Sequence, residues 1–179
     1  MLTICLVRHG ETDYNKRGLV QGRVNVILNH NGRSQAFLLR EKIKEEKFDV
    51  CFSSPLIRAM QTSMILVGDR TLICKDDRLI DRCQGIFEGQ SSKDYDTSLF
   101  WNYDLNSDLD GVEKVQDVFS RVRGFLSYLK DNYNNKKILI VSHGAIIRAL
   151  YHILHETDLS GDLLTFMFDN CYYEKFILK

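Results

Sequence analysis

Residues 137–144 read Lys-Ile-Leu-Ile-Val-Ser-His-Gly, an apolar run that ends in a histidine and a glycine. A short, nearly uninterrupted run of aliphatic residues predicts a strand that is buried on both faces of a sheet. Residues 2–10 end in the same way and read Leu-Thr-Ile-Cys-Leu-Val-Arg-His-Gly. Ligands of α/β sheets bind beyond the carboxyl ends of the strands. If these two strands are neighbours, we expect His9 and His143 to face one crevice.

The pattern of apolar residues on either side of these strands predicts alternating helices and strands. Helices are predicted over 32–46, from Pro55 to about 67, over 113–133 and over 145–155, and further strands over 49–53, 71–74, 163–168 and 172–178. Residues 76–112 lack a period, and we expect an irregular segment with one helical turn near 95–103. The alternation predicts a three-layer α/β/α sandwich around a mostly parallel sheet. A length of 179 residues suits a single domain over 1–179, with a short lid or insertion at about 89–112.

Composition excludes several classes of protein. Lys and Arg together number 24, as do Asp and Glu, so the overall basic excess of a nucleic-acid-binding protein is absent. The run at 2–7 lacks the preceding basic residue of a signal peptide, and no apolar stretch approaches the roughly 18 residues of a membrane span. Five cysteines without a Cys-x-x-Cys pair argue against a zinc site or a disulfide framework. We therefore expect a cytoplasmic protein without a membrane, nucleic-acid or metal partner.

Two arginines complete the chemistry that the histidines suggest. Arg8 adjoins His9, and Arg58 lies at the start of a predicted helix, after Ser53-Ser54-Pro55. The guanidinium fork suits bidentate phosphate binding, and a helix N-terminus adds amide donors. Two histidines and two arginines together predict a pocket for a dianionic phosphate.

Motifs along nearly the whole chain resemble the histidine phosphatase superfamily, in its phosphoglycerate mutase-like branch. The first is Arg8-His9-Gly10-Glu11-Thr12. The others follow in the family's order, and they are Asn15, Gln21-Gly22, Leu28-Asn29, Gly32, residues 53–62 (Ser-Ser-Pro-Leu-Ile-Arg-Ala-Met-Gln-Thr), residues 77–81 (Asp-Arg-Leu-Ile-Asp), Gly85, Glu88-Gly89, residues 111–113 as a degraded Gly-Gly-Glu-Ser segment, and residues 141–144 (Val-Ser-His-Gly).

The resemblance implies a phosphoglycerate mutase-like fold and a transfer of a phosphoryl group by way of phosphohistidine. His9 is then the nucleophile, and a cationic pocket would favour its neutral form. Charge on the phosphoryl oxygens would be stabilised by Arg8, Arg58 and His143, without a metal or a cofactor. The residues expected to contact the substrate are Asn15, Gln21, Gly22 and Gly144.

The proton donor is where the sequence departs from the family. The family usually places a glutamate where this chain has Asp81, which is one methylene shorter. A carboxyl group there could protonate the leaving oxygen and later deprotonate water. Asp81 is the first candidate for this role, and Glu88 and Glu113 stay as alternatives.

The expected activity is hydrolysis of a small phosphate monoester. Ala145 follows the second His-Gly where mutases usually have asparagine, and the segment between Gly89 and Glu113 is short, so water should reach a phosphohistidine. The alternatives are a phosphoglycerate mutase and a non-catalytic phosphate-binding regulatory protein. Sugar phosphates, phosphoglycerates, ribazole phosphate and protein phosphohistidine all stay open as substrates, as do a monomeric and a homodimeric state. Phe100-Trp101 and Tyr103 are expected either to form a hydrophobic lid or to pack the loop onto the domain.

Overall fold

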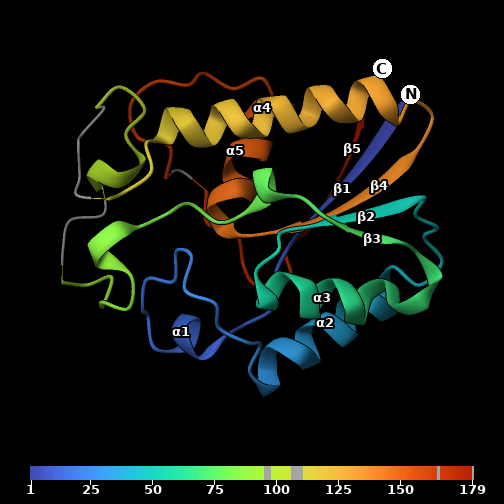
Figure 1. Ribbon diagram of the computed structural model, residues 1–179, viewed down its shortest axis with the longest axis horizontal. Coiled ribbons are helices and arrows are strands. Elements are labelled where there is room, and N and C mark those ends of the chain that lie inside the picture. Colours follow the sequence, from blue (N-terminus) through green and yellow to red (C-terminus); the bar gives the residue numbers. More distant parts are fainter. Residues whose placement is uncertain (95–97, 106–110, 165, 179) are drawn as a thin grey trace.

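The computed structural model describes residues 1–94, 98–105, 111–164 and 166–178. It has an α/β fold in which helices lie on both sides of one sheet (Figure 1). The predicted fold class is therefore confirmed. Within the described residues, no helix combines the length and the apolar character that crossing a membrane requires.

The sheet has five strands in the order β3-β2-β4-β1-β5. β1 (Leu2–Arg8), β2 (Val50–Ser53), β3 (Ile73–Lys75) and β4 (Lys137–Ser142) are parallel, whereas β5 (Tyr173–Leu178) runs antiparallel to β1 at one edge. β1 and β4 are direct neighbours, and their register pairs Val7 with Val141 and Arg8 with Ser142. The residues that follow these pairs, His9 and His143, therefore leave the sheet side by side.

Alternate residues of each central strand enter opposite cores, as the two-residue period of a strand requires. Ile4 and Leu6 of β1 pack in the larger core with α4 (Val115–Asn132) and α5 (Gly144–Leu154). Cys5 and Val7 pack in the smaller core with α2 (His30–Lys42) and α3 (Ile57–Val67), on the opposite side of the sheet in Figure 1. The continuous apolar runs read from the sequence are thus strands covered on both faces.

Short helical elements lie in several of the loops between the strands and the longer helices. Helix α1 (Asp13–Lys16) begins with a capping box, in which Thr12 and Asn15 each accept the other's backbone N–H. Single turns of 3₁₀-helix cover Gly68–Arg70, Asp77–Leu79, Gly85–Phe87 and Ser98–Trp101. The last of these lies within the turn predicted near 95–103, of which residues 95–97 lie outside the described part. The predicted lid at 89–112 likewise includes 106–110, which the structure does not describe.

The prediction of a strand at 163–168 is wrong. The described residues of 163–168 form no strand, because their backbone groups find partners other than a sheet neighbour. Leu163 donates to Trp101, and the carbonyl oxygens of Phe166 and Phe168 accept from the guanidinium groups of Arg148 and Arg8. We refer to residues 166–168 as the strap. Smaller corrections concern the ends of helices: α3 begins at Ile57 and not at Pro55, and the helix predicted over 32–46 spans His30–Lys42.

A close backbone contact joins the loop after β1 to the start of α2. A Cβ atom on Gly32 would lie 2.0 Å from the backbone oxygen of Glu11, so a side chain cannot be placed there without moving backbone. We expect Gly32→Ala to lower the free energy of unfolding by about 1–3 kcal/mol, as overpacking does. Gly124, an exposed residue within α4, has nothing within 4 Å of the point that a Cβ would occupy. Denaturant titration should therefore show that the matched Gly124→Ala is neutral or stabilising by up to about 1 kcal/mol, and equal effects of the two substitutions would contradict this packing.

Candidate active site

The rings of His9 and His143 lie together beyond the carboxyl ends of β1 and β4. Their centroids are 5.2 Å apart, and both side chains are almost completely buried. His9 lines a cavity of about 440 Å³, whereas His143 is not part of its lining. The two matching strand ends thus bring the rings together as expected, but of the two histidines only His9 lines the cavity.

The hydrogen bonds of the two rings determine where their protons lie. The carbonyl oxygen of Gly10 is 2.7 Å from Nδ1 of His9 and can only accept, so Nδ1 carries the proton and Nε2 keeps its lone pair. Nε of Arg58 can only donate, and it lies 3.2 Å from Nε2 of His9 and 3.1 Å from Nδ1 of His143. The proton of neutral His143 is therefore on Nε2, 2.6 Å from the hydroxyl oxygen of Ser54.

The neutral state of both rings is favoured by their surroundings. Burial, and then the positive charges of Arg58 and Arg8, hold the pKa of His9 well below its usual value. The pKa of His143 is lowered in the same direction, first by burial and then by Arg58. His9 is thus an unprotonated nitrogen base at neutral pH, which is the state that a nucleophile needs.

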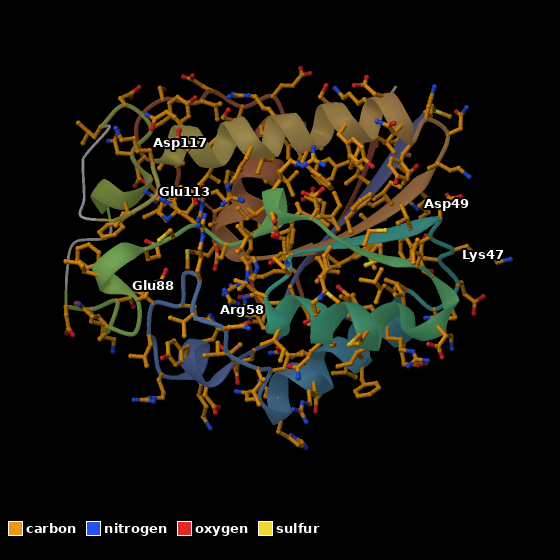
Figure 2. The ribbon with its side chains drawn as sticks, viewed as in Figure 1. Lys47, Asp49, Arg58, Glu88, Glu113 and Asp117 are labelled. Atoms are coloured by element: carbon orange, nitrogen blue, oxygen red, sulfur yellow. The ribbon has the colours of Figure 1, made fainter. Side chains whose placement is uncertain are left out.

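Arg58 is fully buried at the start of α3 (Figure 2), and its guanidinium group forms hydrogen bonds to several parts of the site. Its Nη1 donates to the carbonyl oxygen of Val24, and its Nη2 donates to that of Gly22 and to Asp81. Like His143, Arg58 does not line the cavity. In this geometry it holds the two imidazoles and the loop of Gly22 in place.

Asp81 lines the same cavity as His9. Its Oδ2 is 2.9 Å from Nη2 of Arg58 and 3.7 Å from Nδ1 of His143, and Oδ1 accepts the backbone N–H of Arg82. Burial raises the pKa of the Asp81 carboxyl, although the neighbouring Arg58 acts in the opposite direction. A carboxyl with a raised pKa at the wall of a cavity is suited to giving and taking a proton.

The model described as "Histidine phosphatase superfamily (branch 1)" matches residues 4–177. The chain belongs to branch 1 of the histidine phosphatase superfamily. The resemblance drawn from the motifs is therefore confirmed.

Relatives of this histidine phosphatase superfamily member cover most of its length. Phosphoserine phosphatase 1 of Hydrogenobacter thermophilus is 31% identical over 180 residues, which are 97% of this chain and 85% of that protein. An uncharacterized phosphatase of Bacillus subtilis, PhoE, is 35% identical over 166 residues, 90% of this chain and 79% of that protein. The crystal structure of phosphoserine phosphatase from Entamoeba histolytica in complex with 3-phosphoglyceric acid superimposes with a TM-score of 0.86 at 28% identity, over 99% of this chain and 91% of that one.

Most of the site residues predicted from the family's motifs gather around the cavity. Those that line it are Arg8, His9, Asn15, Gln21, Gly22, Asp81 and Gly144. Nε of Arg8 is buried and has no hydrogen-bond partner among the described residues, so this donor is available to an anion. No group of three or more His, Cys, Asp or Glu side chains in the described part of the chain is arranged to hold a metal ion.

Glu88 and Glu113, the alternative proton donors, do not line the cavity. Both lie on the connection between β3 and α4 (Figure 2). Glu88 accepts the backbone N–H groups of Arg23 and Gln84 and fills the space beside Gly22, where a Cβ would come within 2.1 Å of its carboxylate. Its contacts shape the loop that carries Gly22.

Glu113 acts on the loop of Asp81 through an arginine. Its carboxylate binds Arg121 at 2.7 Å and 3.0 Å. Nη1 of Arg121 donates to the carbonyl oxygens of Arg78 and Ile80, which lie three residues and one residue before Asp81. Glu113 and Arg121 are therefore positioning residues for the carboxyl group that faces the cavity.

Sequence motifs did not reveal the apolar wall of the cavity. It is formed by Leu19, Val20, Phe100, Trp101, Ala145, Leu164, Met167 and Phe168. Phe100 and Trp101 are also buried in the larger core, and Tyr103 packs against it, so these aromatic residues pack their loop onto the domain, which is one of the two roles expected for them. Arg148 of α5 completes the lining. An arginine five residues after His143, on the helix that begins at Gly144, was a signal that could have drawn attention to it.

Proposed function

We propose that this protein is a phosphatase that hydrolyses a small phosphate monoester through a phosphohistidine on His9. The observation that carries the proposal is the unprotonated Nε2 of His9, a residue that lines the same cavity as Arg8 and Asp81. In the free protein Nε of Arg58 donates to this nitrogen, and that hydrogen bond must break for the lone pair to attack phosphorus. The relatives named phosphoserine phosphatase agree with a small phosphorylated metabolite as substrate. A cytoplasmic location remains part of the proposal.

The first step forms a bond between Nε2 of His9 and phosphorus while the ester P–O bond breaks. The proton of Asp81 passes to the leaving oxygen, so that an alcohol and an Asp81 carboxylate are produced. Arg8 and Asn15 bind the phosphoryl oxygens from the cavity side. Arg58 and His143, which do not line the cavity, help to stabilise the negative charge of the phosphoryl group through the protein. Such help matters because phosphoryl transfer depends mainly on positioning and electrostatic stabilisation.

The second step returns the site to its starting state. Asp81 carboxylate takes a proton from water as the water oxygen attacks phosphorus. The N–P bond then breaks, inorganic phosphate leaves, and His9 regains its lone pair. The carboxyl group of Asp81 is again protonated, so the cycle needs no further reactant.

Hydrolysis and isomerisation differ in what attacks the phosphohistidine. With a short connection over the cavity, we expect water to attack, so phosphate release from 3-phosphoglycerate should exceed its conversion to 2-phosphoglycerate. Both rates can be measured in one incubation containing a metal chelator. Isomerisation faster than phosphate release would support the mutase. Binding of phosphate without turnover of any ester, including an activated aryl phosphate, would support the regulatory protein.

A further inference from the structure

The cavity contains a buried cation that the reaction above does not use. Arg148 projects from α5, is only 6% exposed and lines the same cavity as His9 and Arg8. Among the described residues, no carboxylate lies within salt-bridge distance of it. The charges that act on it are those of Arg8 and Arg82, which repel it, and of Asp162, which attracts it. Burial, with Arg8 second, lowers its pKa to about 10, so the guanidinium stays charged at neutral pH.

The hydrogen bonds of Arg148 leave donors unused. Nη2 donates to the carbonyl oxygen of Phe166 in the strap at 3.0 Å and lies 4.0 Å from the sulfur atom of Met167. Nε is buried and has no partner among the described residues. The hydrogen bonds that Arg148 makes to them come from Nη2, which leaves Nη1 without one. Because a buried donor without a partner is costly, a missing acceptor is indicated.

Aromatic rings flank the guanidinium of Arg148. Its Cζ lies 4.5 Å from the ring centroid of Trp101 and 6.0 Å from that of Phe168. Rings stacked on a planar guanidinium occupy its faces and leave its edge, where the N–H groups lie, for a ligand. Trp101 and Phe168 also line the cavity, so they offer apolar contact to the carbon atoms of the same ligand.

Arg148 is close to the expected phosphate position. Arg8 donates to the carbonyl oxygen of Phe168, and Arg148 donates to that of Phe166, so both guanidinium groups hold the same short strap. The cavity of about 440 Å³ is lined by both. One small molecule can therefore place its phosphate at Arg8 and His9 and a second group at Arg148.

We propose that Arg148 binds a carboxylate of the substrate, so that the ester cleaved at His9 is the phosphate of a small carboxylic acid. A carboxylate matches the single charge of Arg148 and accepts from the donors that lack partners. The inference rests on the proposed phosphatase function. It goes beyond that function by making Arg148 a residue that determines specificity.

The test uses pairs of substrates that differ in this group alone. Phosphoserine is compared with phosphoethanolamine, and 3-phosphoglycerate with glycerol 3-phosphate, in the wild type and in Arg148→Met. We expect the wild type to prefer the acid of each pair, and the substitution to lower the ratio of kcat/KM values about 10–100-fold, mainly through KM of the acid. Arg148→Lys should retain part of the preference because it keeps the charge.

Arg123→Met is the matched control. Arg123 is an exposed arginine of α4 that also stacks on an aromatic ring, with its Cζ 5.7 Å from the centroid of Phe119, and it is outside the cavity lining. This variant should keep the wild-type ratio. A merely structural role for Arg148 would lower kcat/KM for both members of each pair alike, and that result would overturn the proposal. So would a wild type that hydrolyses both members equally well. Absence of turnover with every ester would instead contradict the phosphatase function itself.

Discussion

Replacing His9 by alanine should lower phosphate release from every ester by about 10³-fold or more, because no other unprotonated ring nitrogen lines the described part of the cavity. The loss should appear in kcat, since Arg8 and Asn15 still bind the phosphate. Burial and two arginines keep His9 neutral, so its removal takes away the group that forms the bond to phosphorus. Release of inorganic phosphate, followed over time with purified protein, measures the effect.

His30→Ala is the control for this experiment. His30 is an exposed histidine at the start of α2, away from the cavity, and we expect this variant to keep wild-type rates. Because His9 is buried, thermal unfolding of both variants should be compared before the rates are interpreted. Phosphate release that persists in a folded His9→Ala protein would show that the nucleophile lies elsewhere.

Asp81→Asn should lower kcat for alkyl phosphates by about 10²–10⁴-fold, the usual contribution of a general acid. An aryl phosphate with a good leaving group should lose much less, because its oxygen departs without a proton. The exposed Asp117 of α4 offers a matched Asp117→Asn control (Figure 2). Equal losses for alkyl and aryl esters would contradict the role of Asp81 as the acid in the first step.

The direction in which kcat/KM changes with pH follows from the shifted pKa values of Asp81 and His9. Protonated Asp81 is lost as the pH rises through its pKa, which burial raises, and neutral His9 is lost as the pH falls through its pKa, which burial lowers. For alkyl phosphates, kcat/KM should therefore be highest on the acidic side of neutrality. The decline on the alkaline side should disappear in Asp81→Asn, and its persistence would assign it to another group.

Much of this fold was predictable because its signals are local. β1 and β4 are apolar runs buried on both faces, and such runs can be recognised without knowing their neighbours. The His-Gly sequence after each one then locates the site, since parallel neighbours end at one edge of the sheet. The helical stripe of α4 is equally local, with Val115, Val118 and Phe119 all buried on one side.

The remaining features depend on contacts between distant residues. The segment at 163–168 has the apolar residues of a strand, but its carbonyl groups are bound by Arg8 and Arg148, which no local pattern reveals. Family motifs identify Glu88 and Glu113 without showing whether they reach the cavity. Only their partners, Arg23 and Arg121, show that these carboxylates hold loops in place.

The most direct measurement is to trap the covalent intermediate. The protein is mixed with an ester carrying a radiolabelled phosphoryl group, quenched in base within the first turnover and digested, and the labelled peptide is then sequenced. Label on His9 that is stable in base, is lost in acid and disappears at the rate of phosphate release would support a phosphohistidine intermediate. Turnover with no label on His9, under conditions that preserve phosphohistidine and with release slow enough for it to accumulate, would contradict it.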